Sequence, residues 1–280
     1  MTWTFSTDLA AYLAAARPAL AARPVLDTSL LTVTDALERR GPAAYGPAAP
    51  LFGWWSAPDG SVAGALLHTP PFPLLLGVVP DEAVPALAAA LAGEPLLAGV
   101  DAVNARRADA RRLAAALGGP SRVVEENRLF RLTALAAPDP APRGRARPAT
   151  EADLPLLLEW NEAYDAEIGS PGAGSEAGLR DRISYGGALL WEHAGTPRAL
   201  AAFSRPIGST SRVQQVYTPP SERRRGYAAG VTHAASLAAY AAGAAEVLLF
   251  TDLANPTSNG VYRRLGFTPI EDRVQLALDG

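Results

Sequence analysis

Residues 221–230, SERRRGYAAG, carry a run of arginines into a glycine and then into an alanine-rich segment. The preceding residues, VQQVYT at 213–218, are typical of a strand, and the residues after Gly226 are typical of a helix. The loop therefore leads into a helix N-terminus, where backbone N–H groups lack partners and an anion is stabilised. Gly226 allows the backbone to approach a ligand closely, and Ala228 keeps the first turn small. Taken alone, the stretch is more typical of a solvated charge run before a turn, and its surroundings decide between the two interpretations.

A second motif, TDLANPTSNGVYRRLGF at residues 251–267, follows the next apolar strand. Asn255 begins a turn, Asn259 lies at the start of a short helix, and Tyr262 follows. A strand, R-x-x-G-x-A, an alanine-rich helix, a further strand and N-x-x-Y-x-x-x-G-F follow one another over residues 212–268. This series resembles the acyl-CoA-binding half of the GNAT superfamily of N-acetyltransferases, and the resemblance extends the expected fold over residues 146–280.

The resemblance implies a role for each part of the series. Backbone N–H groups between Arg224 and Ala229 would hold the diphosphate of acetyl-CoA, the expected acyl donor. The backbone of Val216 and Tyr217 would pair with the pantetheine arm and polarise the thioester carbonyl. The expected cofactor-binding residues are Val216, Tyr217, Arg223, Arg224, Arg225, Gly226, Tyr227, Ala228, Ala229, Asn255, Ser258 and Asn259.

Tyr262 is the expected catalytic residue, because the resemblance assigns it to the leaving thiolate. Acyl transfer from a thioester to an amine develops an oxyanion and expels a thiolate. A tyrosine with a pKa of about 10 stays protonated at neutral pH and can donate to that sulfur. The structural alternative for Tyr262 is a core aromatic residue on a short helix.

The acceptor amine must lose a proton, which requires a base or a chain of water molecules. Residues 159–169, EWNEAYDAEIG, supply several carboxylates, and the GNAT resemblance places the acceptor near this region. Glu167 is the predicted base or amine-binding carboxylate, because it precedes a Gly-Ser-Pro-Gly loop at 169–172 that could close over a substrate. Trp160 and Tyr164 are the expected substrate-binding residues. A solvated acidic helix face is the alternative.

The proline-rich segment at residues 137–153, APDPAPRGRARPATEAD, favours an extended connector between two mixed halves. We expect an accessory or degenerate GNAT-like domain at 1–136, a linker at 137–149 and a catalytic GNAT domain at 150–280. The expected fold class is α/β in the broad sense (α+β). Each of two tandem GNAT-like domains would have a mixed, mostly antiparallel sheet flanked by helices.

The hydrophobic patterns predict the elements of both halves. In the first half, the expected helices are 1–23, 28–41, 81–93 and 104–119, and the expected strands are 51–57, 61–69 and 123–135. In the second half, the expected helices are 150–169, with Thr150 as its cap, 223–244 and 258–267, and the expected strands are a hairpin at 186–208, then 211–219, 245–253 and 272–279.

The first half lacks a comparable diphosphate loop in its sequence. Pro80-Asp81-Glu82 occupies the corresponding place, and carboxylates there would repel a phosphate while stabilising the helix dipole. This half is expected to be a GNAT-like domain that no longer binds cofactor, or equally an unrelated α/β domain.

The composition excludes several kinds of catalytic and binding site. The chain is 49% hydrophobic, with a net charge of -3 and a pI of about 5.7, which predicts a soluble, cytoplasmic protein without a general nucleic-acid surface. It contains no cysteine, and every basic residue is an arginine, so cysteine nucleophiles and Schiff-base lysines are excluded. No histidine has metal-ligand spacing, and no segment is long enough to span a membrane.

The favoured function is an acetyl-CoA-dependent N-acetyltransferase that acts on a small-molecule amine or amino acid by direct transfer in a ternary complex. A non-catalytic acyl-CoA-binding sensor or partner-binding module is the alternative, and protein-directed acylation is less favoured. Tyr262 favours catalysis, since a module that only binds needs no donor to a thiolate. The sequence leaves open the acceptor, the acyl-chain length and the oligomeric state, a homodimer included.

Overall fold

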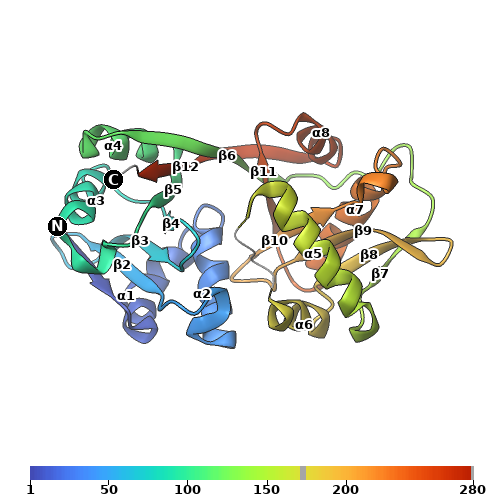
Figure 1. The fold of residues 1–280 in the computed structure, drawn as a ribbon, viewed down its shortest axis with the longest axis horizontal. Helices are drawn as coiled ribbons and strands as arrows, with labels where there is room; N and C mark the ends of the chain where they lie inside the picture. Colours follow the sequence, from blue (N-terminus) through green and yellow to red (C-terminus); the bar gives the residue numbers. More distant parts are fainter. Residues whose placement is uncertain (171–174, 279–280) are drawn as a thin grey trace. The chain divides into compact units, whose positions relative to one another are not determined.

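The computed structural model describes residues 1–170 and 175–278, which divide into two compact units (Figure 1). Unit 1 comprises Met1–Asn127 together with the chain from Glu271 onward, and unit 2 comprises Arg128–Ile270. In the described part of the chain, no helix is long and apolar enough to cross a membrane.

Unit 1 holds the elements of the first half and the end of the last strand. They are β1 (Thr2–Ser6), α1 (Leu9–Ala21), α2 (Thr28–Arg40), β2 (Leu51–Ser56), β3 (Val62–His68), β4 (Leu74–Leu76), α3 (Ala83–Gly93), β5 (Ala102–Arg106), α4 (Arg107–Leu117), the start of β6 (Ser121–Leu132) and the end of β12 (Phe267–Leu278). Its strands follow the order β1-β2-β3-β4-β5-β12, antiparallel except for the parallel pair β4 and β5.

Unit 2 holds the elements of the second half and the end of β6. They are β7 (Arg145–Pro148), α5 (Leu154–Ile168), α6 (Glu176–Ser184), β8 (Ala188–His193), β9 (Thr196–Phe203), β10 (Thr210–Tyr217), α7 (Tyr227–Ala241), β11 (Glu246–Asp252) and α8 (Pro256–Arg264). In the order β6-β11-β10-β9-β8-β7, β10 pairs parallel with β11, and the pairs from β10 to β7 are antiparallel.

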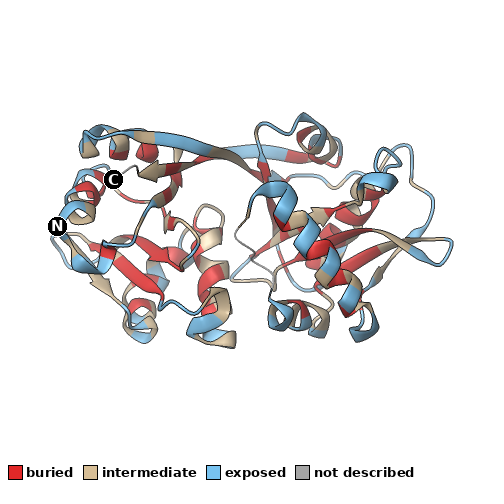
Figure 2. Ribbon diagram, viewed as in Figure 1, coloured by how far each residue is buried: buried red, intermediate tan, exposed pale blue. Residues whose placement is uncertain are grey.

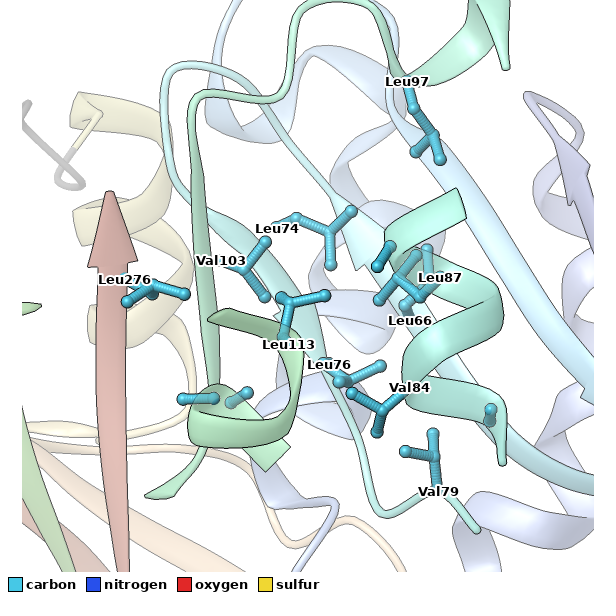
Figure 3. Packing of buried hydrophobic residues seen from close by; sticks show 14 of the residues in the cluster. Leu66, Leu74, Leu76, Val79, Val84, Leu87, Leu97, Val103, Leu113 and Leu276 are labelled. Atoms are coloured by element: carbon cyan, nitrogen blue, oxygen red, sulfur yellow. The ribbon is translucent and has the colours of Figure 1, made fainter. Parts of the chain in front are cut away.

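Both units cover the two faces of their sheet in the same way. In unit 1, α3 and α4 pack on one face, where Leu66 and Val103 lie (Figure 3), and α1 and α2 pack on the other, where Phe52 and Leu67 lie. In unit 2, α7 and α8 cover one face and α5 and α6 the other. The buried residues follow the strands and the inner sides of these helices (Figure 2). The predicted fold class, a mixed and mostly antiparallel sheet with helices in each half, is confirmed.

The last strand of each half ends in the other half's unit. Phe130 and Leu132 of β6 are buried in the core of unit 2, with Val247 of β11. Val274 and Leu276 of β12 are buried in the core of unit 1. The compact units therefore do not follow the expected chain boundaries of 1–136 and 150–280, because each core needs a strand from the opposite half. The expected linker at 137–149 ends in an edge strand, β7, which is where a proline-containing strand is tolerated.

Local chemistry explains where several helices begin. The side chain of Asp8 accepts hydrogen bonds from the N–H groups of the first turn of α1, and Asn255 caps α8 in the same way. Thr150 and Asp153 form a reciprocal capping box at the start of the segment that continues into α5, as the sequence predicts.

Two predicted helices are corrected at their first residues. The segment 1–23 is not helical throughout, because Thr2–Ser6 pairs antiparallel with β2 and the helix begins only after Asp8. The segment 104–119 begins as strand, since β5 continues to Arg106 with Val103 and Ala105 buried on one side. Strand β4 and helix α6 were not predicted, because each is short and its pattern is weak.

Arg273 is a buried cation in unit 1. Its guanidinium donates to the carbonyl oxygens of Leu76 and Asn104 at 2.6 and 3.1 Å, and its Nε donates to the Asn104 side chain at 2.9 Å. It thus ties the end of β4 to β5 and β12. Glu271 lies 3.6 Å from the same guanidinium and partly balances its charge.

We predict that Arg273→Met lowers the free energy of unfolding by about 3–5 kcal/mol, because it leaves buried carbonyl oxygens and Glu271 without their cationic partner. Urea denaturation followed by circular dichroism measures the change. Arg39→Met is the matched control: Arg39 pairs with Asp35 on the surface, and its loss should cost less than about 1 kcal/mol. Equal effects of the two substitutions would contradict the role of Arg273.

Candidate functional site

Strands β10 and β11 are paired over only the first part of β10. Their parallel register runs from Thr210 opposite Glu246 to Val213 opposite Leu249. Beyond it, the pairing of β10 with β9 is interrupted by a bulge between Gln214 and Tyr217. Gln215 lies in this bulge with φ of +47°, a left-handed conformation that is strained for a residue with a side chain. The last residues of β10 therefore leave the register with β11.

The N-terminus of α7 follows directly and is open. Gly226 is its N-cap residue with φ of +79°, and among the described residues no side chain accepts a hydrogen bond from its first turn. Arg224 is also left-handed, with φ of +61°. Where left-handed and right-handed backbone conformations alternate, successive N–H groups point into one concavity. The helix dipole adds partial positive charge there. The loop thus has the geometry of a helix terminus that can accept an anion, and its binding of a diphosphate stays a prediction.

The arginines of the loop have different surroundings. Arg223 donates to Glu167 at 2.5 Å and to the carbonyl oxygen of Thr218 at 2.9 Å. Arg225 pairs with Glu222 at 3.2 Å, and Glu222 in turn accepts a hydrogen bond from Arg198 at 2.5 Å. No partner for the Arg224 guanidinium is found among the described residues. Arg223 and Arg225 therefore hold the loop in place, and Arg224 is left to meet a ligand.

Small residues in α7 also serve packing. A Cβ atom added at Gly230 would lie 2.8 Å from Pro142 and from Trp191, closer than real contacts allow. Trp191 donates from its indole nitrogen to the carbonyl oxygen of Arg143 at 2.9 Å. The glycine thus lets the proline-rich segment lie against α7. Tyr227 is buried, and its hydroxyl lies 3.0 Å from Nδ1 of His193.

Tyr262 is buried on α8, where its ring packs edge-on against Phe267 with centroids 6.1 Å apart. Burial raises the pKa of Tyr262 well above its usual value, and the nearby Tyr164 adds to that shift. The phenol therefore stays protonated at neutral pH and remains a hydrogen-bond donor. Tyr164 belongs to the helices on one face of the sheet and Tyr262 to those on the other.

The predicted aromatic residues gather at the end of β10. The Tyr217 ring lies 5.9 Å from the Trp160 ring and 6.4 Å from the Tyr164 ring, measured between centroids. The structure therefore brings together the predicted substrate-binding pair and one of the predicted cofactor-binding residues.

The two asparagines after β11 differ in role. Asn255 caps a helix, whereas Asn259 is a candidate ligand-binding residue. Asn255 accepts a hydrogen bond from Ser258 N–H at 3.0 Å, which caps α8 and occupies both residues. Asn259 donates to the carbonyl oxygens of Asp252 and Asn255 at 2.8 and 2.7 Å. Its own Oδ1 is buried and has no hydrogen-bond partner among the described residues. A buried acceptor of this kind fits a donor group on a ligand.

The structure places Glu167 at the diphosphate loop, where Arg223 engages its carboxylate and both side chains are largely exposed. Its predicted role as a base stays a prediction, and the loop expected to close over the substrate lies partly outside the described residues, at 171–174. Sequence reasoning passed over Asp165, which is buried on the sheet-facing side of α5. Its spacing from Leu157 and Asn161 places it on the apolar stripe of the helix and could have identified it.

In unit 1, an arginine side chain binds backbone groups at the parallel strand pair. Its parallel pair is β4 and β5, and Arg273 binds the carbonyl oxygens of Leu76, at the end of β4, and of Asn104, within β5. Beyond β4, Val78 N–H donates to Asp27 at 2.8 Å, and Arg106 donates to the carbonyl oxygen of Val79 at 3.2 Å. The backbone groups that could hold a ligand there already have partners within the unit.

A family model and several solved structures are similar to this chain. Residues 194–276 match the family model of FR47-like proteins. An acetyltransferase of the GNAT family from Colwellia psychrerythraea is similar in structure, with a TM-score of 0.66 at 13% identity over 100% of both chains. A GCN5-related N-acetyltransferase from Sphaerobacter thermophilus has a TM-score of 0.62 at 18% identity, over 98% of this chain and 94% of that one.

A GCN5-related N-acetyltransferase from Kribbella flavida is also similar, with a TM-score of 0.58 at 24% identity, over 78% of this chain and 88% of that one. None of the curated proteins matches the sequence. Residues 194–276 thus resemble FR47-like proteins, and the chain as a whole shares its fold with these acetyltransferases.

We predict opposite stability effects for neighbouring arginines of the loop. Arg224→Gly should raise the free energy of unfolding by up to about 1 kcal/mol, because a left-handed conformation costs about 1–2 kcal/mol with a side chain and less for glycine. Arg225→Gly, the control, should lower it by about 1 kcal/mol, since it loses the Glu222 pair and adds chain entropy. Chemical denaturation compares them, and destabilisation by both would contradict the strained geometry at Arg224.

Proposed function

We propose that the protein is an acetyl-CoA-dependent N-acetyltransferase that transfers the acetyl group directly to a small-molecule amine or amino acid in unit 2. The observation that carries the proposal is the uncapped N-terminus of α7 behind Gly226, beside the point where β10 and β11 separate. A diphosphate fits the first feature, and an extended thioester arm fits the second.

The residues present fit acetyl-CoA as donor substrate. N–H groups from Arg224 to Ala229 and the free Arg224 guanidinium would hold the diphosphate. The backbone of Val216 and Tyr217 would lie along the pantetheine arm, and the orphaned Oδ1 of Asn259 would accept from an amide N–H. Acetyl-CoA supplies the activated thioester; the protein supplies positioning and hydrogen-bond donors.

Tyr262 would act on the leaving group. Because burial keeps its phenol protonated, it can donate a proton to the thiolate as the carbon–sulfur bond breaks. A protein that only bound acyl-CoA would have no use for a buried, protonated donor at the thioester. Unit 1 would bind no cofactor, because Arg273 and Asp27 hold the corresponding backbone groups, and would serve unit 2 by contributing β6 to its sheet.

We predict that Tyr262→Phe lowers kcat by roughly 100-fold or more, while the affinity for acetyl-CoA changes little, since only the proton donor is lost. Release of CoA can be followed with a thiol reagent, and the absence of cysteine removes the protein's own background. Tyr240→Phe, a tyrosine on α7 outside the aromatic cluster, is the control. Unchanged turnover in Tyr262→Phe would remove this residue from the mechanism.

We also predict that Gly226→Asp abolishes the protection that CoA gives against thermal unfolding. The aspartate would place a negative charge and a side chain where the diphosphate must approach. Gly243→Asp is matched for backbone strain, because Gly243 also has positive φ, +101°, but lies beyond the other end of α7. Protection that survives in Gly226→Asp, or is lost equally in Gly243→Asp, would count against the diphosphate assignment.

A further inference from the structure

One carboxylate of α5 differs from its neighbours in its surroundings. The acidic residues of the helix are Glu159, Glu162, Asp165 and Glu167. The glutamates are exposed, whereas Asp165 is 8% exposed and faces the sheet. It shares this face with Asn161, one turn earlier, and with Tyr164 of the aromatic cluster. Burial of a carboxylate is costly unless hydrogen bonds or a cation compensate it.

A directed chain of hydrogen bonds ends on Asp165. Arg182 of α6 donates to Oε1 of Gln215 at 2.6 Å, and the Gln215 amide donates to Oδ1 of Asn161 at 2.5 Å. The Asn161 amide then donates to Oδ2 of Asp165 at 2.9 Å. Every link points its donor toward the carboxylate, so the chain polarises in one direction from the Arg182 cation to the Asp165 anion. The charged form of Asp165 is the form that this chain stabilises.

The chain passes through the bulge that defines the site. Gln215 is the left-handed residue of that bulge, and it precedes Tyr217 by two positions. Strain of this kind persists where surrounding contacts fix it, and it concentrates at functional sites. On the helix side, Tyr164 immediately precedes Asp165 and interacts with Tyr262. Asp165 is thus tied by its neighbours on both sides to the proposed thioester end of the site.

From this geometry we propose that Asp165, rather than Glu167, binds the acceptor as an ammonium ion and receives its proton. The proposal rests on the proposed function and names its substrate class: small primary alkylamines that are cationic at neutral pH. A buried carboxylate attracts an ammonium strongly because the local dielectric is low. The half-buried ring of Tyr164, packed against the buried rings of Trp160 and Tyr217, would contact the apolar part of such an amine.

The protons balance in the following way. The ammonium gives a proton to the Asp165 carboxylate, and the free amine nitrogen adds to the thioester carbonyl carbon. The carbon–sulfur bond breaks as the amide forms, and Tyr262 gives its proton to the thiolate. The remaining extra proton on nitrogen restores Tyr262, and Asp165 releases its proton to water. The products are the N-acetylamine, CoA as free thiol and a proton.

The test measures transfer by the full chain with 2-phenylethylamine, tyramine, spermidine and phenylalaninamide, and with aniline as an acceptor that is neutral near pH 7. Asp165→Asn keeps the shape of the side chain and removes its charge; Glu162→Gln, an exposed carboxylate on the same helix, is the matched control. We expect Asp165→Asn to lower kcat/KM for the best alkylamine by about 100-fold or more. We expect Glu162→Gln to stay within about threefold of the parent, with acetyl-CoA affinity unchanged in both.

A merely structural role for Asp165 would lower transfer to aniline as much as transfer to the alkylamine. We expect the loss with aniline to be smaller than about tenfold, since no ammonium is bound. Equal losses on both acceptors, a large loss in Glu162→Gln, or an unaffected Asp165→Asn would each overturn the assignment while leaving the proposed function standing. Failure of the parent protein to acetylate any of these amines would overturn the assignment together with the proposed function.

Should Asp165→Asn fail to fold, inhibition of the parent protein still tests the assignment of Asp165. N,N-dimethyl-2-phenylethylamine is cationic at neutral pH but cannot form a stable amide, and 2-phenylethanol is its neutral counterpart. We expect the tertiary amine to compete with the acceptor and the alcohol to compete at least about tenfold more weakly. Equal inhibition by the two compounds would overturn the assignment of a carboxylate to the acceptor ammonium.

Discussion

The separation of β10 from β11 after Val213 is the constraint on which the rest of the site depends. A parallel pair that continued to the end of β10 would satisfy its own backbone groups and leave no room for an extended arm. The bulge around Gln215 turns the strand away instead, at the expense of a strained left-handed residue. Tyr164 and Tyr262, which pack on opposite faces of the sheet, interact across this part of the unit.

The chain beyond the bulge forms the other end of the candidate site. From Tyr217 it runs through the arginine loop into α7, whose first turn has no cap among the described residues. The loop is held by side chains on both sides, with Glu167 binding Arg223 and Glu222 binding Arg225. An anion site is stronger when its donors are fixed before the ligand arrives, because little ordering is left to occur on binding. The strained strand and the open helix therefore belong to one preorganised arrangement.

The two units share a layout but differ where this arrangement would lie. Both place helices on two faces of a sheet that contains one parallel pair, and each completes its core with the last strand of the other half. In unit 1, Arg273 from β12 binds the carbonyl oxygens that a ligand would otherwise meet. The strand that unit 1 receives from the second half thus also supplies the side chain that occupies these carbonyl oxygens.

The sequence predicts some parts of this structure better than others. The arginine-glycine loop, the helix behind it and the Asn-to-Tyr motif are local patterns, and the structure forms each of them where the pattern lies. Strand β1 was taken for helix because its alternation is short and its partner, β2, lies far along the chain. The burial of Arg273 follows from the approach of β4, β5 and β12, which no local pattern records. Asp165 was within reach of sequence reasoning through its helical spacing, whereas its link to Gln215 required the fold.

The central claim is that unit 2 alone can hold the diphosphate of an acyl-CoA, by the open helix N-terminus beside the separated strands. Isothermal titration calorimetry of CoA into the full chain tests it most directly, because it counts sites as well as measuring affinity. The account predicts a single site per chain. A second site of similar affinity, which would open unit 1 to the cofactor, or no binding at all would contradict it.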